Sequence, residues 1–216
     1  MPIGSVVRRG VRCQRHRTSR RFSPNMAVMS ASLEYPKKHL ISAEEYLRMG
    51  EGGVFAPNAR LELIEGEIIE MAPIGGPHLK RVNKLTRLFI ERSGDRAIVS
   101  VQNPLVISDR SVPEPDLVLL KPREDEYERS LPTAADVLLA VEVSDTTVRF
   151  DLRTKAPLYA RCGVAELWVV DVNEQVVHVF RDAGAKGYGT SSVVKPGQSV
   201  ICLALPEVFI EFGELF

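Results

Sequence analysis

Two carboxylates and one amine stand at positions where their charges require partners. Asp116 directly precedes the aliphatic run LVLL, residues 117–120, and Glu142 interrupts the apolar segment DVLLAVEV, residues 136–143. Burying an unpaired acid in such a strand costs several kcal/mol, so Glu142 needs a partner. Asp116 has the same charge and cannot be that partner. A divalent cation would suit both carboxylates, and hard oxygen ligands favour Mg²⁺ or Mn²⁺ over zinc.

Lys155 lies in the segment that follows Glu142. Asp151, Lys155 and Tyr159 are spaced four residues apart and would share one face of a helix. An ammonium group there could orient a water molecule or balance charge that develops on a phosphate. The same spacing allows a plain surface pair between Asp151 and Lys155, worth about a few tenths of a kcal/mol. Spacing alone leaves both interpretations open.

Length and composition predict one soluble globular domain. The chain has 216 residues, of which 44% are hydrophobic and 26% are charged. No run of apolar residues is long enough for a membrane span, and the N-terminal arginines precede no signal-peptide core. The three cysteines, Cys13, Cys162 and Cys202, form no CxxC pair. We therefore expect a cytoplasmic protein without disulfides or structural zinc.

The charge is unevenly distributed along the chain. Residues 1–31 contain seven arginines and no acid, and the whole chain has 28 basic and 28 acidic residues, so residues 32–216 carry a net charge of −7. We predict a disordered basic tail over 1–31 and one folded domain over 32–216. The tail could contact nucleic acid or a membrane surface, or it could be inert. It could also be translated sequence upstream of a true start at Met26 or Met29.

Local signals predict an α/β (α+β) domain in which helices flank a central mixed β-sheet. A capping box at Ser42–Glu45 begins a short helix, residues 60–71 form a hairpin that turns at Glu65–Gly66, and Pro77 begins a helix over 77–93. A further helix is expected from an Asp151 N-cap to about Arg161. The predicted strands are AIVSVQ, PLVI, LVLL, DVLLAVEV, ELWVVD, QVVHVFR, and two weaker ones near 188–194 and 199–205.

Five segments in order resemble the Uma-two family, restriction-endonuclease-like proteins of the PD-(D/E)XK nuclease superfamily. They are RLELIEGEI, GGPH, PEPD, VEVSDTT and DLRTKAPLYARCGVAELWVVD, and the resemblance covers about residues 36–212. It implies a restriction-endonuclease-like fold and divalent-metal-dependent cleavage of phosphodiester bonds. It also implies nucleic acid, with DNA as the expected substrate, and a homodimer.

The resemblance assigns roles to individual residues. Asp116 and Glu142 match the motif acids that hold the metal, Mg²⁺ or Mn²⁺, together with the carbonyl of Val143. Ser144 stands where the superfamily pattern expects lysine. The family supplies that lysine from the following helix, which makes Lys155 the catalytic amine. A long flexible side chain can reach the same point from another backbone position.

Three further positions match the family. Glu62 matches an acid on the first strand and would be another ligand or a water-positioning base, although it could be a solvent-facing strand residue. His78 could contact a phosphate, or it could cap or pack the helix. Tyr159 could hydrogen-bond near the site or serve only in packing. Trp168 is expected in the core.

The expected reaction is in-line hydrolysis by a metal-bound water, with Lys155 stabilising the water or the transition state. The rival is a catalytically silent nuclease-fold binding module that acts through protein or nucleic-acid contacts. The net charge of −7 favours this rival, because surfaces that track phosphates are generally basic. A cluster on one helix could line a cleft or could be a solvated face: Lys80, Arg81, Lys84 and Arg87. The absence of GxSxG and HExxH motifs argues against an ordinary small-molecule hydrolase.

Overall fold

A six-stranded mixed sheet forms the centre of the fold. The computed structural model describes residues 36–216, so the predictions for the basic tail lie outside the described residues. The strands lie in the spatial order β3 (Ile98–Val101), β4 (Leu117–Leu120), β5 (Val137–Ser144), β6 (Glu166–Asp171), β7 (Val176–Gly184) and β8 (Gly187–Val194). β5 and β6 are parallel and every other neighbouring pair is antiparallel. The predicted central mixed sheet is confirmed.

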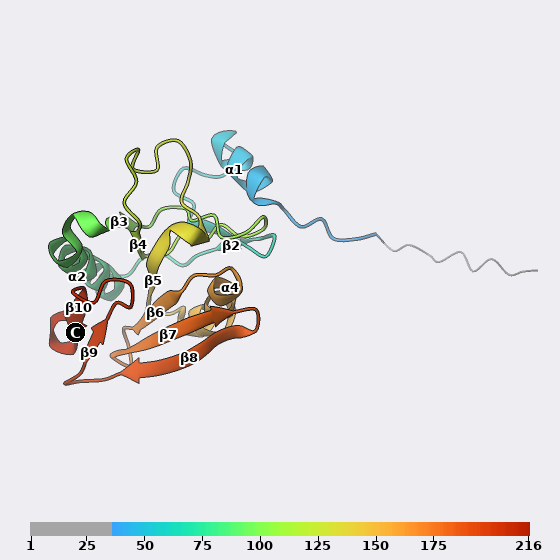
Figure 1. Cartoon of the computed structure of the whole chain (residues 1–216). Coiled ribbons are helices and arrows are strands. Elements are labelled where there is room, and N and C mark those ends of the chain that lie inside the picture. The colour runs from blue at the N-terminus through green and yellow to red at the C-terminus, as the bar shows by residue number, and fades with distance from the viewer. Residues whose placement is uncertain (1–35) are drawn as a thin grey trace, which may run out of the picture. The chain divides into compact units, whose positions relative to one another are not determined.

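Helices cover both faces of the sheet, as the buried run LVLL required. Leu117 and Leu119 pack in one core with Leu85 and Phe89 of α2 (Gly76–Ser93), and α5 (Phe212–Leu215) completes this layer. Val118, Leu120 and Ala140 pack in a second core with residues of α4 (Ala156–Arg161). In Figure 1, α2 lies beside β9 (Ser199–Ile201) and β10 (Phe209–Glu211), away from α4. Alternate residues of β4 and β5 therefore point to different layers.

The N-terminal elements agree with their sequence signals. The reciprocal hydrogen bonds of a capping box between Ser42 and Glu45 begin α1 (Ala43–Glu51). β1 (Leu61–Ile64) and β2 (Glu67–Glu70) form the expected hairpin, in which Glu65 and Gly66 have φ values of 51° and 85°. A Cβ atom at residue 66 would lie 2.7 Å from the Leu40 Cβ. The turn therefore needs glycine for both its conformation and its space.

Two predicted strands are wrong in part or in whole. PLVI forms no strand, because the chain reverses there: the Leu105 N–H bonds to the Pro113 carbonyl and the Ile107 N–H to that of Ser111. The last predicted strand ends early, as β9 (Ser199–Ile201), where it pairs with β10 (Phe209–Glu211), which the sequence analysis missed. Two short 3₁₀ turns lie elsewhere: η1 (Gly94–Arg96) precedes β3 and η2 (Ala134–Asp136) precedes β5.

The helix after β5 does not begin at Asp151, so the predicted N-cap is wrong. Helical structure starts earlier, at α3 (Val148–Phe150), continues through a π-helical turn, η3 (Asp151–Lys155), and passes into α4. The Asp151 carboxylate instead accepts hydrogen bonds of 2.7 Å from the hydroxyls of Ser144 and Thr147. Asp151 and Lys155 are both buried, which excludes the exposed ion pair. No helix within residues 36–216 has the length and apolar character of a membrane span.

Candidate active site

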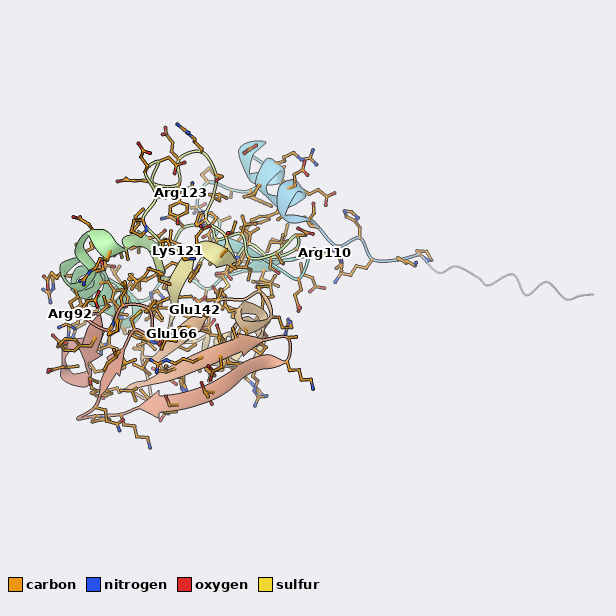
Figure 2. All side chains as sticks on the ribbon, in the orientation of Figure 1. Arg92, Arg110, Lys121, Arg123, Glu142 and Glu166 are labelled. Atoms are coloured by element: carbon orange, nitrogen blue, oxygen red, sulfur yellow. The ribbon has the colours of Figure 1, made fainter. Side chains whose placement is uncertain are left out.

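A strongly acidic pocket lies where β4 begins and β5 ends. Six carboxylates line it, and only three basic or potentially basic side chains oppose them. The carboxylates are Glu62, Glu114, Asp116, Glu142, Asp145 and Asp151, and the others are Arg60, His78 and Lys155. Glu142, labelled near the middle of the view in Figure 2, is buried. Such an excess of buried negative charge is unfavourable unless cations or protons compensate it.

Strand register brings Asp116 and Glu142 together. β4 and β5 are antiparallel with Leu117 opposite Val141, and extending this register by one residue sets Asp116 opposite Glu142. Directly opposed residues of an antiparallel pair lie on the same face of the sheet. The N–H of Val143 also donates a 2.8 Å hydrogen bond to Asp116 Oδ2. The fold therefore holds these two carboxylates on one wall of the pocket.

Asp116 is fixed from two further directions. His78 Nε2, at the start of α2, lies 3.0 Å from Asp116 Oδ2, and Gln102 Nε2 donates to Oδ1 at 3.1 Å. Burial alone would raise the pKa of Asp116. The hydrogen bond and charge of His78, together with the hydrogen bonds from Val143 and Gln102, outweigh the effect of burial and lower that pKa. Asp116 is therefore an ionised carboxylate with a defined orientation.

Lys155 forms ion pairs with two of the pocket acids, Glu62 and Glu142. Its Nζ lies 2.9 Å from Glu62 Oε1 and 3.0 Å from Glu142 Oε1, and all three side chains are almost completely buried. Tyr159 donates a 2.7 Å hydrogen bond to the same Glu142 oxygen. The four side chains come from β1, β5, η3 and α4, so only the complete fold assembles them.

The protonation equilibria reflect one buried ammonium between two buried carboxylates. Burial opposes the charge on Lys155, but Glu142, Glu62 and Asp151 together outweigh it and raise its pKa, so the amine stays protonated. Burial raises the pKa of Glu142 well above its usual range, and the charge of Lys155 offsets this only in part. Burial also raises the pKa of Glu62, again against Lys155. The cluster therefore retains affinity for a proton or a further cation.

The pocket chemistry fits a hydrated divalent cation. Glu62 Oε2 is buried and has no hydrogen-bond partner in the described part of the chain. Within residues 36–216, no group of three or more His, Cys, Asp or Glu side chains is arranged to hold a metal ion. Mg²⁺ commonly uses one or two carboxylates and keeps several waters, so Asp116, Glu142 and the Val143 carbonyl would suffice for it.

The structure brings together every side chain proposed for the site. Glu62 is buried, so its interpretation as a solvent-facing residue is wrong. His78 and Tyr159 contact Asp116 and Glu142 directly, so neither serves only in packing. Trp168 is buried in the core, as expected. These contacts place the residues, while their catalytic roles stay predictions.

The basic cluster on α2 does not contribute to the pocket. The described residues that line the pocket include none of its four members, and Arg81 is buried with its guanidinium 5.2 Å from the centre of the Phe216 ring. Lys80 and Arg87 are exposed on the side of the helix opposite His78. The solvated-face interpretation fits these positions better than a cleft wall.

Sequence reasoning missed several residues that line the pocket or contact its side chains. Gln102 gave only one signal, its place at the end of a predicted strand, and its positive φ of 52° is visible only in the structure. Glu114 belongs to the quoted PEPD segment and Asp145 to VEVSDTT, so both were within motifs already noticed. Arg60 precedes the first hairpin strand. A rule that every acid within a motif is a pocket candidate would have found two of these four.

Comparisons with known proteins agree with this architecture. A family model described as "Uma2: Putative restriction endonuclease" matches residues 43–212. A crystal structure of a putative nuclease belonging to DUF820, from Anabaena variabilis, superposes with a TM-score of 0.62 at 19% sequence identity and covers 82% of this chain and 97% of its own. None of the curated proteins matches the sequence. At this identity the structural likeness supports the fold alone.

Proposed function

This chain belongs to the Uma2 family of restriction-endonuclease-like proteins, and on that premise we propose that it is a divalent-metal-dependent endonuclease that cleaves nucleic acid, with DNA as its substrate. One observation carries the proposal. The pocket that contains Asp116 and Glu142 also contains a buried lysine whose ammonium bonds to Glu142 and Glu62. Buried ionisable groups with shifted pKa values cluster at functional sites, so three charges and a tyrosine hydroxyl buried together favour an active site.

Each residue has a defined task in this proposal. Asp116, Glu142 and the Val143 carbonyl would hold Mg²⁺ or Mn²⁺, which lowers the pKa of a bound water and polarises the scissile phosphate. His78 and Gln102 orient the Asp116 carboxylate, and Tyr159 orients that of Glu142.

Lys155 and Glu62 act on the water and the phosphate. The Lys155 ammonium, held charged by its two carboxylates, would donate a hydrogen bond to the attacking oxygen or to a phosphate oxygen that gains charge. Glu62 would accept the proton of the water. Burial raises its pKa, which makes it a better proton acceptor than an exposed glutamate.

The first test is metal dependence. We expect the full chain to cut double-stranded DNA in Mg²⁺ or Mn²⁺ and to stop in excess EDTA, as measured by gel electrophoresis. Single-stranded DNA and RNA assayed in parallel identify the substrate class. Cation binding by calorimetry without cleavage of any of these substrates would favour the catalytically silent binding module. A chain that neither binds the cation nor cleaves would refute the nuclease proposal.

We also propose a homodimer, supported by the outer edge of β8, with which no other strand within residues 36–216 pairs. β8 is the last strand of the sheet, eight residues long, and contains neither proline nor charge in GYGTSSVV. Exposed edges of this length are usually blocked by charges, prolines or bulges unless another chain pairs with them. An identical edge related by a twofold axis would extend the sheet in the antiparallel sense.

The dimer is tested by its mass in solution. Ser191 is exposed within β8, so Ser191→Lys should place like charges at the twofold and shift the sedimentation equilibrium mass from dimer to monomer. Asn83→Lys adds the same charge at an exposed position on α2 and should leave the dimer intact. A wild-type chain that sediments as a monomer at all concentrations would refute this arrangement.

A further inference from the structure

The turn that carries Lys155 has an unusual hydrogen-bond pattern. Over Asp151–Lys155 the chain forms a π-helical turn, and the Ala156 N–H donates to the carbonyl of Asp151 instead of that of Leu152. Helical backbone precedes this turn in α3 and follows it in α4. Single wide turns of this kind are rare in proteins, and those that occur often lie at functional sites.

Pro157 gives a physical cause for the wide turn. It has no N–H, and in a regular α-helix its ring would clash with the carbonyl four residues earlier, that of Arg153. A turn with one more residue moves that carbonyl away from the ring. Local widening of the helix therefore accommodates the proline ring without a clash, and no sharp kink is required.

The wide turn sets the direction of Lys155 relative to two fixed points. Before it, Asp151 is anchored by the hydroxyls of Ser144 and Thr147. After it, Tyr159 is fully buried and bonded to Glu142. One residue corresponds to about 100° of rotation in an α-helix, so a regular helix could not keep both anchors and the present direction of Lys155.

We propose that Pro157 is a positioning residue: by enforcing the wide turn, it directs the Lys155 ammonium to Glu62 and Glu142 together. Pro157 lies outside the pocket lining, so we assign its effect on the site to the direction of Lys155. The predicted effect on cleavage rests on the proposed nuclease function. The effect on the lysine does not, because the ion pairs are present in the protein alone.

The test is Pro157→Ala in the full chain. Alanine restores an N–H that can bond to the Arg153 carbonyl and is the best helix former, so the melting temperature should stay level or rise. Turnover should fall about 100-fold with little change in KM, as expected when a catalytic group moves by about 1 Å. A proline with a purely structural role would not give higher stability together with lower turnover.

A second readout is independent of nuclease activity. In protein labelled with ¹⁵N-lysine, the buried Lys155 ammonium should give a slowly exchanging NMR signal, assigned by its absence from Lys155→Arg. Pro157→Ala should abolish or strongly shift this signal. Pro157→Gly, which also restores the N–H, repeats the measurement should the alanine variant fold poorly. The control is Pro77→Ala, a proline in the first turn of α2, where no N–H is needed, and it should leave the signal unchanged.

The outcomes separate this proposal from the nuclease proposal. Loss or displacement of the ammonium signal in the Pro157 variants, but not in Pro77→Ala, supports the positioning role even if the wild type cleaves no nucleic acid. An unchanged signal in a folded Pro157 variant overturns it. Absence of the signal from the wild type also overturns it, since Lys155 would then not be held.

Discussion

Glu142→Gln should lose cation binding and cleavage together while the protein stays folded. The amide has nearly the same shape but lacks the anionic oxygen that a hard cation requires. Cleavage should fall about 1,000-fold or more, comparable with the loss of a group that stabilises charge in the transition state. Isothermal titration calorimetry with Mn²⁺ and a plasmid cleavage assay measure the two effects.

Stability should not fall with activity in this variant. Burial raises the pKa of Glu142, so folding favours its protonated form, and its charge reduces stability as the pH rises above the usual glutamate range. A neutral glutamine removes that cost at pH 7. We expect a melting temperature equal to or higher than that of the wild type.

Glu166 offers a matched control on the adjacent strand. It is a buried acid that does not line the pocket, and it accepts hydrogen bonds from Trp168 Nε1 at 2.9 Å and Arg181 Nη2 at 2.7 Å. Glu166→Gln should therefore cost stability, because it weakens the ion pair between buried Glu166 and half-buried Arg181, but leave cation binding intact. Wild-type affinity for Mn²⁺ in Glu142→Gln would contradict the assignment of Glu142 as a ligand.

The elements predicted correctly from the sequence are those determined by interactions between residues close together in the chain. The capping box at Ser42 and the turn at Glu65–Gly66 were predicted correctly because their hydrogen bonds and φ values involve residues adjacent in the chain. The buried LVLL strand was predictable because apolar residues on both faces require cover from both sides. β10 was missed because its short segment becomes a strand only by pairing with β9.

Most members of the candidate site were predictable from the sequence, but their geometry was not. The spacing of Asp151, Lys155 and Tyr159 placed them on one face of a helix, yet spacing does not say whether that face meets solvent or a core. The wide turn before Pro157 altered even this spacing. Likewise, Gln102 approaches Asp116 only because β3 and β4 pair. Such contacts depend on strand order, which one sequence does not specify.

Lys155→Met should be among the most destabilising single substitutions in this domain. The variant removes the ammonium that bonds to Glu62 and Glu142, and it leaves these two buried carboxylates without that partner of opposite charge. Breaking a buried ion pair in this way costs about 3–5 kcal/mol. Chemical denaturation monitored by Trp168 fluorescence at pH 7 should show this loss in the free energy of unfolding.

The pH dependence identifies the cause of that loss. In Lys155→Met the charge that most strongly opposes burial is gone, so the pKa values of Glu62 and Glu142 should rise further than they already do. A raised carboxyl pKa in the folded state means that stability is regained as the pH falls through that pKa. The gap between variant and wild type should therefore narrow from pH 7 toward pH 5. Lys80→Met removes the same charge from an exposed position and should show neither the loss nor its recovery. A gap that is independent of pH would mean that lost packing of the lysine side chain, and not unpaired carboxylates, destabilises the variant.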